Sequence, residues 1–275
     1  MKIRAITSLG IAVVGIPLLI FSKYLIFTVA LSLLAFLATF EMLRALGLGK
    51  IYYISVPAYL LALALPFPTY FMAGKETTYI LILALSFFAY LLYLFALAVF
   101  MRGKIKYSEI GEAFMSVVYV VASFTSFGIL RYLENGLWCL SLVFVGAWGC
   151  DVFAYLVGSM IGRHKLIPEI SPKKTVEGSI GGIVFATGGF ALFGWIISMT
   201  TSLVPNYLVL LIAGFASSII AQIGDLIASF IKREHGVKDY GRILPGHGGI
   251  MDRFDSALAV TTSLMVICLL FPPFS

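Results

Sequence analysis

Residues 178–224 read GSIGGIVFATGGFALFGWIISMTTSLVPNYLVLLIAGFASSIIAQIG. These 47 residues contain no charged side chain, and one helix needs only about 20 apolar residues to cross ~30 Å of hydrocarbon. The stretch is therefore long enough for two membrane-spanning helices. Turn-forming residues near its middle, Thr200-Thr201-Ser202 and Pro205-Asn206, predict where the first helix ends and the second begins. The sequence thus predicts a helical hairpin within a membrane.

The chain as a whole has the same apolar character. Of its 275 residues, 61% are hydrophobic and 12% are charged, and the mean hydropathy is +1.03, which excludes a soluble globular domain with a polar surface. The apolar runs are roughly 17 to 25 residues long, unlike the ~10-residue alternating segments of an outer-membrane barrel. We predict an all-α fold, a polytopic transmembrane helical bundle of about nine spans. These spans cover residues 5–22, 24–40, 51–72, 77–100, 113–130, 136–157, 179–199, 207–230 and 256–271.

Nine spans use most of the chain, so an active site must be built from helix ends and short loops. We divide the chain by function into two regions. Residues 1–130 hold N-terminal transmembrane helices without a catalytic motif, and residues 131–275 form the catalytic transmembrane region. Most of the mixed-sign charge lies in two loops of the second region, residues 158–178 and 231–255.

Lysine and arginine are distributed unevenly over the loops. Of the 19 Lys and Arg residues, 16 fall on the side that holds the N-terminus and the loops after even-numbered spans. Lys23, Lys75 and Arg131 fall on the other side. The positive-inside rule therefore predicts that the N-terminus and both charged loops are cytoplasmic and that the C-terminus is outside. We expect a multi-pass protein of the cell inner membrane, with its active site facing the cytoplasm.

Two acidic residues lie within predicted spans. Asp225 has apolar neighbours on both sides, one to two turns inside the end of the eighth span. An ionised carboxylate is costly there unless it is paired or bound to a cation. Asp151 repeats the situation at the cytoplasmic end of the sixth span. Both are candidates for a functional site, and a structural salt bridge to a neighbouring helix is the alternative for each.

The loop from Ser171 to Gly178 combines hydroxyls with two adjacent lysines. It reads Ser-Pro-Lys-Lys-Thr-Val-Glu-Gly, and the glycine opens the next predicted helix. Ammonium groups, hydroxyls and helix N-terminal amides together suit a phosphate chain. The alternative is that Lys173 and Lys174 anchor the topology or contact anionic lipid.

The segment from Ser229 to Asp255 is rich in charge and in turn formers. Its Pro-Gly-His-Gly-Gly run at residues 245–249 cannot be helical throughout and lets backbone amides approach a ligand closely. Asp252 and Asp255 follow three residues apart, so both can point one way, with Arg253 beside them. A magnesium-bound phosphoryl substrate requires such oxygen ligands for the cation and such positive groups for the phosphates.

The same segment fits the pattern S-x-x-K-R-x-x-x-x-K-D-x-G-x-x-L-P-x-H-G-G-x-x-D-R-x-D. This pattern resembles the signature of the phosphatidate cytidylyltransferases, also called CDP-diacylglycerol synthases. Upstream, Asp151-x-x-Ala154-Tyr155 and the Ser171–Gly178 block resemble two further blocks of that family. The resemblance implies a transferase of phospholipid biosynthesis that converts CTP and phosphatidate into CDP-diacylglycerol and pyrophosphate.

The resemblance also implies roles for individual residues. Mg²⁺ and, given the number of carboxylates, a second cation would be bound by Asp225, Asp252, Asp255 and Asp151. Besides Asp225 and Asp252, the catalytic candidates are Lys173, Lys174, His247 and Arg253. The candidates for binding the nucleotide or a lipid head group are Ser171, Thr175, Glu177, Gly248, Gly249, Lys232, Arg233 and Lys238.

The expected partners are CTP, phosphatidate from the bilayer and anionic lipids, without nucleic acid, and a homodimer is a further expectation. Two other classes of protein stay open. A CTP-dependent polyprenol or lipid-alcohol kinase would need the same metal and nucleotide site and also a base for its hydroxyl substrate, and it would release CDP instead of pyrophosphate. A transporter would also use intramembrane acids, but here the acids cluster at one face and no internal repeat is evident.

Overall fold

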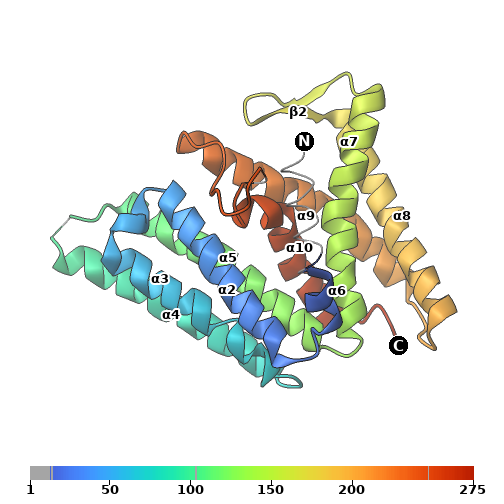
Figure 1. The fold of residues 1–275 in the computed structure, drawn as a ribbon, viewed down its shortest axis with the longest axis horizontal. Helices are drawn as coiled ribbons and strands as arrows, with labels where there is room; N and C mark the ends of the chain where they lie inside the picture. Colours follow the sequence, from blue (N-terminus) through green and yellow to red (C-terminus); the bar gives the residue numbers. More distant parts are fainter. Residues whose placement is uncertain (1–12, 14, 103, 247) are drawn as a thin grey trace. The chain divides into compact units, whose positions relative to one another are not determined.

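The computed structural model describes residues 13, 15–102, 104–246 and 248–275. Long helices, labelled as in Figure 1, make up most of this part of the chain. The α-helices are α2 (Leu25–Ala45), α3 (Tyr52–Ala64), α4 (Glu76–Phe100), α5 (Tyr107–Tyr132), α6 (Gly136–Phe144), α7 (Cys150–Ile161), α8 (Val176–Thr200), α9 (Tyr207–Glu234) and α10 (Met251–Leu270). The shorter elements are the 3₁₀ turns η1 (Leu48–Lys50) and η2 (Phe67–Tyr70), the π-helical turn η3 (Val145–Gly149) and the strands β1 (Lys165–Ile167) and β2 (Ser171–Thr175).

Eight segments in the described part of the chain are long and apolar enough to cross a membrane. Each coincides with one of the predicted spans from the second to the ninth, so the predicted all-α, multi-pass fold is confirmed. Several helices extend beyond the predicted ends; α5, for instance, begins at Tyr107 instead of residue 113. Half of the first predicted span, residues 5–12 and 14 of 5–22, lies outside the described residues.

The turn predicted within the uncharged stretch is where the sequence placed it. Helix α8 ends at Thr200 and α9 begins at Tyr207. The side chain of Asn206 accepts a hydrogen bond from the amide of Val209 at 3.3 Å, which satisfies one of the free amides at the start of α9. Polar turn formers were therefore a sufficient signal for this boundary.

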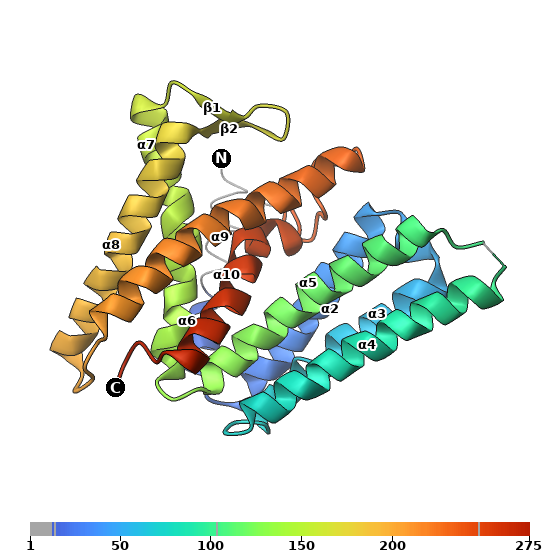
Figure 2. The ribbon, with the colours of Figure 1, turned by 180° about the vertical axis from the view of Figure 1, so that it is seen from behind.

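The chain divides into two compact units. The first unit comprises Met1–Tyr132 and His235–Arg253, and the second comprises Leu133–Glu234 and Phe254–Ser275. In the first unit, α5 packs against α2, α3 and α4 (Figure 2). In the second unit, α8 packs between α7 and α9. The functional division near residue 130 stays a prediction, and the Ser229–Asp255 segment is shared between the two compact units.

Part of the loop predicted at residues 158–178 is a β-hairpin. Strands β1 and β2 pair antiparallel, with Lys165 opposite Thr175 and Ile167 opposite Ser171. The amide of Ile170 donates to the carbonyl of Ile167 at 3.3 Å, and Pro168 occupies the second position of this turn, which its fixed φ favours. The hairpin extends from the ends of α7 and α8 (Figure 1), and it carries both lysines of the block on β2.

Candidate active site

Closely packed helices bring the acidic residues of the second unit together. A Cβ added to Gly224 on α9 would lie 2.8 Å from the Cβ of Ala259 and 3.0 Å from the carbonyl oxygen of Asp255, both on α10. Small residues allow such close approach of helices in a membrane. Gly224 directly precedes Asp225, so this contact between α9 and α10 fixes the position of the Asp225 backbone beside the first turns of α10.

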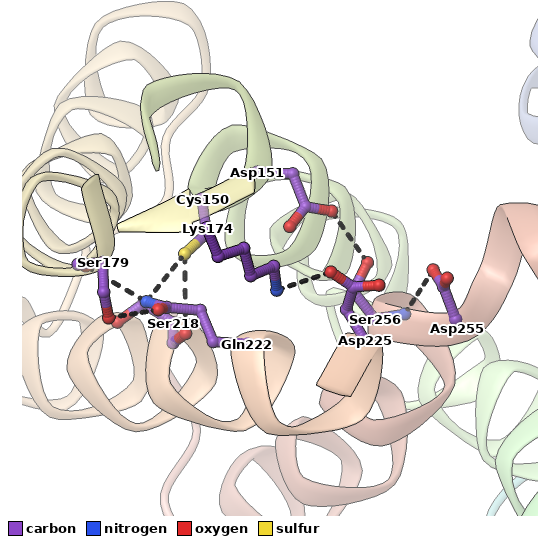
Figure 3. Close-up of polar contacts among 9 residues, drawn as sticks. All are labelled: Cys150, Asp151, Lys174, Ser179, Ser218, Gln222, Asp225, Asp255 and Ser256. Carbon is purple, nitrogen blue, oxygen red and sulfur yellow. Dashed lines mark hydrogen bonds and ion pairs between the residues drawn. The ribbon is translucent and has the colours of Figure 1, made fainter. Parts of the chain in front are cut away.

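Asp151, Asp225 and Asp255 come from three helices and face one region (Figure 3). The Asp225 charge acts on both other carboxylates. Ser256 connects Asp151 with Asp255. Its hydroxyl donates a hydrogen bond to the Asp151 carboxylate at 3.0 Å, and its amide donates one to the Asp255 side chain at 2.8 Å. The structure therefore brings together three of the four predicted metal-site residues in the second unit.

The π-helical turn η3 lies directly before Asp151. It joins α6 and α7 into one segment, Gly136–Ile161, that is long enough to span a membrane. A π-helical turn inserts an extra residue into the helical repeat and is frequent at functional sites. It changes the direction in which the residues of α7 point relative to those of α6, and no pattern in the apolar run predicted it.

Lys174 forms an ion pair within this acidic region. Its Nζ lies 2.5 Å from an Asp225 carboxylate oxygen, and both side chains are about three-quarters buried, with 23% and 25% exposed. Lys173 precedes it on β2 and is exposed, since neighbouring residues of a strand point to opposite faces. The two lysines of the block therefore differ: Lys174 neutralises part of the acidic cluster, while Lys173 faces outward.

Gln222 forms a cross-link between helices on the other side of Lys174 (Figure 3). Its amide nitrogen donates to the Ser179 carbonyl at 3.2 Å and approaches Cys150 Sγ at 3.5 Å. Its amide oxygen accepts a hydrogen bond from the Ser179 hydroxyl. These contacts join α7, α8 and α9 one turn before Asp225, so Gln222 helps to hold the helices that carry Asp151 and Asp225.

Two predicted binding residues of the Ser171–Gly178 block hold the hairpin in place. Thr175 is the N-cap of α8, where its hydroxyl accepts from the Gly178 amide at 3.2 Å. Helix α8 thus begins at Val176, before the glycine that was predicted to open it. Glu177 accepts from the amides of Arg163 and His164 at 3.1 and 3.2 Å and pairs with the His164 ring at 2.6 Å. Their contacts fix the base of the hairpin, and their assignment to the nucleotide stays a prediction.

Asp252 lies in the first unit, at the start of α10. It is buried, with 8% of its surface exposed, and its Oδ2 accepts from the amides of Tyr240 and Gly249 at 2.9 and 3.0 Å. The amide of Gly249 is therefore engaged by Asp252. Gly248 has a φ of +85°, which glycine adopts readily, and its carbonyl accepts from the Leu244 amide at 2.9 Å. The glycine run is thus a tight turn that encloses Asp252.

The other predicted residues are more peripheral. Lys232 is half-buried near the end of α9, and its charge acts on Asp255. Ser171 is half-buried at the start of β2. His247 lies outside the described residues. Arg233, Lys238 and Arg253 are exposed.

Glu41 was not predicted as part of the site. It is 2% exposed on α2, and its Oε2 accepts from the Met251 amide at 2.9 Å. The available signal was an acidic residue near the end of an apolar span, the same signal that identified Asp225. Unlike Asp225, Glu41 has no recognisable motif around it in the sequence.

The acidic cluster offers oxygen atoms of the kind that hard cations use as ligands. Carboxylate and hydroxyl oxygens are the ligands that Mg²⁺ prefers, and Mg²⁺ is usually bound by one or two carboxylates together with substrate phosphates. In the described part of the chain, no three acidic, histidine or cysteine side chains are grouped so that they could hold a metal ion. A cation at this cluster would therefore need further ligands, such as the phosphates of a substrate.

The fold and this site define a multi-pass membrane protein with an acidic and basic cluster suited to phosphates. Residues 2–271 match the profile of the family described as the cytidylyltransferase family. The chain is 36% identical to the phosphatidate cytidylyltransferase of Bacillus subtilis (strain 168), over 98% of both chains. It is 34% identical to the phosphatidate cytidylyltransferase of Staphylococcus epidermidis, over 97% of this chain and 98% of the relative. The chain belongs to the cytidylyltransferase family and is therefore a nucleotidyltransferase.

Proposed function

We propose that this protein transfers the cytidylyl group of CTP to phosphatidate, giving CDP-diacylglycerol and pyrophosphate in phospholipid biosynthesis. The observation that carries the proposal is the cluster of Asp151, Asp225, Asp255 and Lys174 on membrane-spanning helices and the adjoining hairpin. Membership of the cytidylyltransferase family and the names of its relatives support the same reaction.

The chemistry requires charge neutralisation more than it requires a base. A phosphate monoester is largely dianionic at pH 7 because its second pKa is about 6, so a phosphatidate oxygen can attack the α-phosphorus of CTP without losing a proton to the enzyme. The barrier is the repulsion between the lipid phosphate and the triphosphate. Lys174 is held beside the acids and can supply positive charge to the phosphates, and the exposed Lys173 and Arg253 are proposed to hold the CTP phosphates and the departing pyrophosphate.

We assign the cation to the carboxylates. Asp225, Asp255 and Asp151 would hold Mg²⁺ in the second unit, and Asp252 stands one helical turn before Asp255 on α10. A bound Mg²⁺ would neutralise phosphate charge and polarise the phosphoryl oxygens. The proposal also includes a second cation. It gives Asp225 and Asp252 the same role, that of cation ligands.

The partition of Lys and Arg supports a location in the inner membrane, with the hairpin and residues 235–250 in the cytoplasm, where CTP is present. Helices that border lipid would let phosphatidate arrive from the bilayer. Lys232, Arg233 and Lys238 are proposed to attract phosphatidate and other anionic lipids. A homodimer is proposed as the assembly, and nucleic acid is not among the proposed ligands.

Transfer of a phosphoryl group to a lipid alcohol is less well supported. The relatives named above are cytidylyltransferases, and a kinase would need a base beside its hydroxyl substrate. Product analysis separates the two reactions. Purified protein is incubated with phosphatidate, Mg²⁺ and CTP labelled either at the α- or at the γ-phosphate. We expect α-label in the lipid product and γ-label in pyrophosphate. Lipid that carries γ-label would overturn the proposal.

A further inference from the structure

Glu41 is a buried acid that the proposed mechanism does not use. It lies near the end of α2 with 2% of its surface exposed, and its Oε1 has no hydrogen-bond partner among the described residues. A buried carboxylate without full hydrogen bonding is destabilising, so the position calls for an explanation.

The carboxylate of Glu41 holds the start of α10. Its Oε2 accepts from the amide of Met251, the first residue of that helix, at 2.9 Å. The first amides of a helix have no partner within the helix, and a negative charge is favourable there. Glu41 thus provides a cap for α10 from a helix that is far away in the sequence.

The same carboxylate explains two glycines of the signature segment. A Cβ added to Gly241 or to Gly249 would collide with the Glu41 side chain. Both glycines are buried. They are therefore required for the close approach of Glu41, whatever contacts their amides make with a substrate.

Two carboxylates accept hydrogen bonds from backbone amides of this segment. Asp252 accepts from Tyr240 and Gly249, and Glu41 accepts from Met251. The Asp252 charge also acts on Glu41, so the two acids lie close together despite their repulsion. Asp252 directly follows Met251, whose amide Glu41 holds. The orientation of the Asp252 side chain therefore depends on the backbone position that Glu41 fixes.

We propose that Glu41 is a positioning residue for cytidylyl transfer: it fixes the first turn of α10 and thereby orients Asp252. The inference rests on the proposed function, because it takes Asp252 to be a cation ligand. Because Glu41 lies on α2, the proposal also gives one of the N-terminal helices a role in the reaction.

The test compares Glu41→Ala and Glu41→Gln with a matched control, Glu109→Gln. Glu109 accepts from the amide of Lys106 at 2.7 Å near the start of α5, in the same unit. We expect Glu41→Ala to lower kcat by about 10- to 100-fold, to raise the Mg²⁺ concentration for half-maximal rate, and to reduce the increase in melting temperature that Mg²⁺ causes. Glu41→Gln should recover most of each property, because its amide oxygen can still accept from Met251. Glu109→Gln should behave like the parent.

Further variants keep the test decisive. If Glu41→Ala does not fold, Glu41→Asp replaces it, because the shorter side chain keeps the charge but withdraws the acceptor; we expect the same defects. The Glu41 proposal alone would be overturned if the folded Glu41 variant keeps the kcat and Mg²⁺ response of the parent while Asp252→Asn loses them. A parent-like Mg²⁺ response in Asp252→Asn would instead overturn the cation assignment, and a parent that makes no CDP-diacylglycerol would overturn the proposed function.

Discussion

Lys174 on β2 and Asp225 on α9 form an ion pair with an N–O distance of 2.5 Å. Both side chains are largely buried, and Asp225 is repelled by two neighbouring acids, so Lys174 offsets part of the acidic charge at this position. The pair connects the hairpin to the acidic cluster. In the proposed mechanism, a lysine that would act on the phosphates is therefore in direct contact with a carboxylate that would bind the cation.

The different surroundings of the two lysines predict different defects. Lys174→Met should lower kcat by about 100-fold or more, the size of effect that follows loss of a preorganised charge at a reacting group. Lys173→Met should mainly raise the KM for CTP, because Lys173 is exposed and belongs to the outer face of the hairpin. Steady-state kinetics of both variants in the same detergent measure this. Equal kcat values for the two variants would contradict the distinction.

Glu177 should matter through the hairpin it anchors. Glu177→Gln weakens the contacts with the amides of Arg163 and His164, so we expect faster hydrogen exchange across residues 163–175 and a several-fold lower kcat. His164→Ala is the matched control, because its side chain is 79% exposed and exposed ion pairs contribute about 0–1 kcal/mol. Unchanged exchange in Glu177→Gln would show that the strand pairing holds the hairpin without this residue.

Gly224→Ala should separate α9 from α10. The new methyl group would lie within 3.0 Å of the Asp255 carbonyl oxygen, and overpacking typically costs about 1–3 kcal/mol. Gly188→Ala in α8 meets no atom within 4 Å, and a helical alanine is about 1 kcal/mol more favourable than glycine. Melting temperatures should therefore fall for Gly224→Ala and stay level or rise for Gly188→Ala. The opposite order would mean that the contact is not tight.

Sidedness is tested by labelling. Single cysteines replacing the exposed Lys173 and Lys238, in a background without native cysteine, should react with an impermeant thiol reagent only after the inner membrane is opened. A cysteine at Lys75, on the other predicted side, should react in intact cells once the outer surface is accessible. Reaction of the first two positions in intact cells would reverse the proposed topology.

The sequence predicted the spans well because a helix that crosses hydrocarbon leaves a long apolar run, which needs no tertiary information to detect. It also indicated that Asp225 needs a compensating partner, since an acid inside such a run is costly. The partner was not predictable: Lys174 stands on a hairpin whose strand pairing depends on a five-residue strand, and short strands leave little pattern. The turn at Pro168 was the one local signal for it.

The roles within the signature segments were harder to predict than their positions. The assignment of Thr175 and Glu177 to the nucleotide stays a prediction, but their structural role was not predicted, because a hydroxyl before a helix can equally be an N-cap. Gly249 looked like a point of approach for a ligand, while in the structure Glu41 occupies the space beside it. The contact joins residues at opposite ends of the chain, and no spacing rule in one sequence reveals such a pair.

The central claim is that the carboxylate of Asp225 serves cation-dependent cytidylyl transfer. The most direct measurement is CDP-diacylglycerol formation from α-labelled CTP by Asp225→Asn, together with its melting temperature in EDTA and in Mg²⁺. We predict no product and no stabilisation by Mg²⁺. We expect a melting temperature in EDTA close to that of the parent, because loss of the ion pair is offset by relief of the repulsion from Asp151 and Asp255, and the Lys174 charge still acts on Asp151. Magnesium-dependent product formation by a variant that melts far below the parent in EDTA would contradict the account and make Asp225 a structural residue.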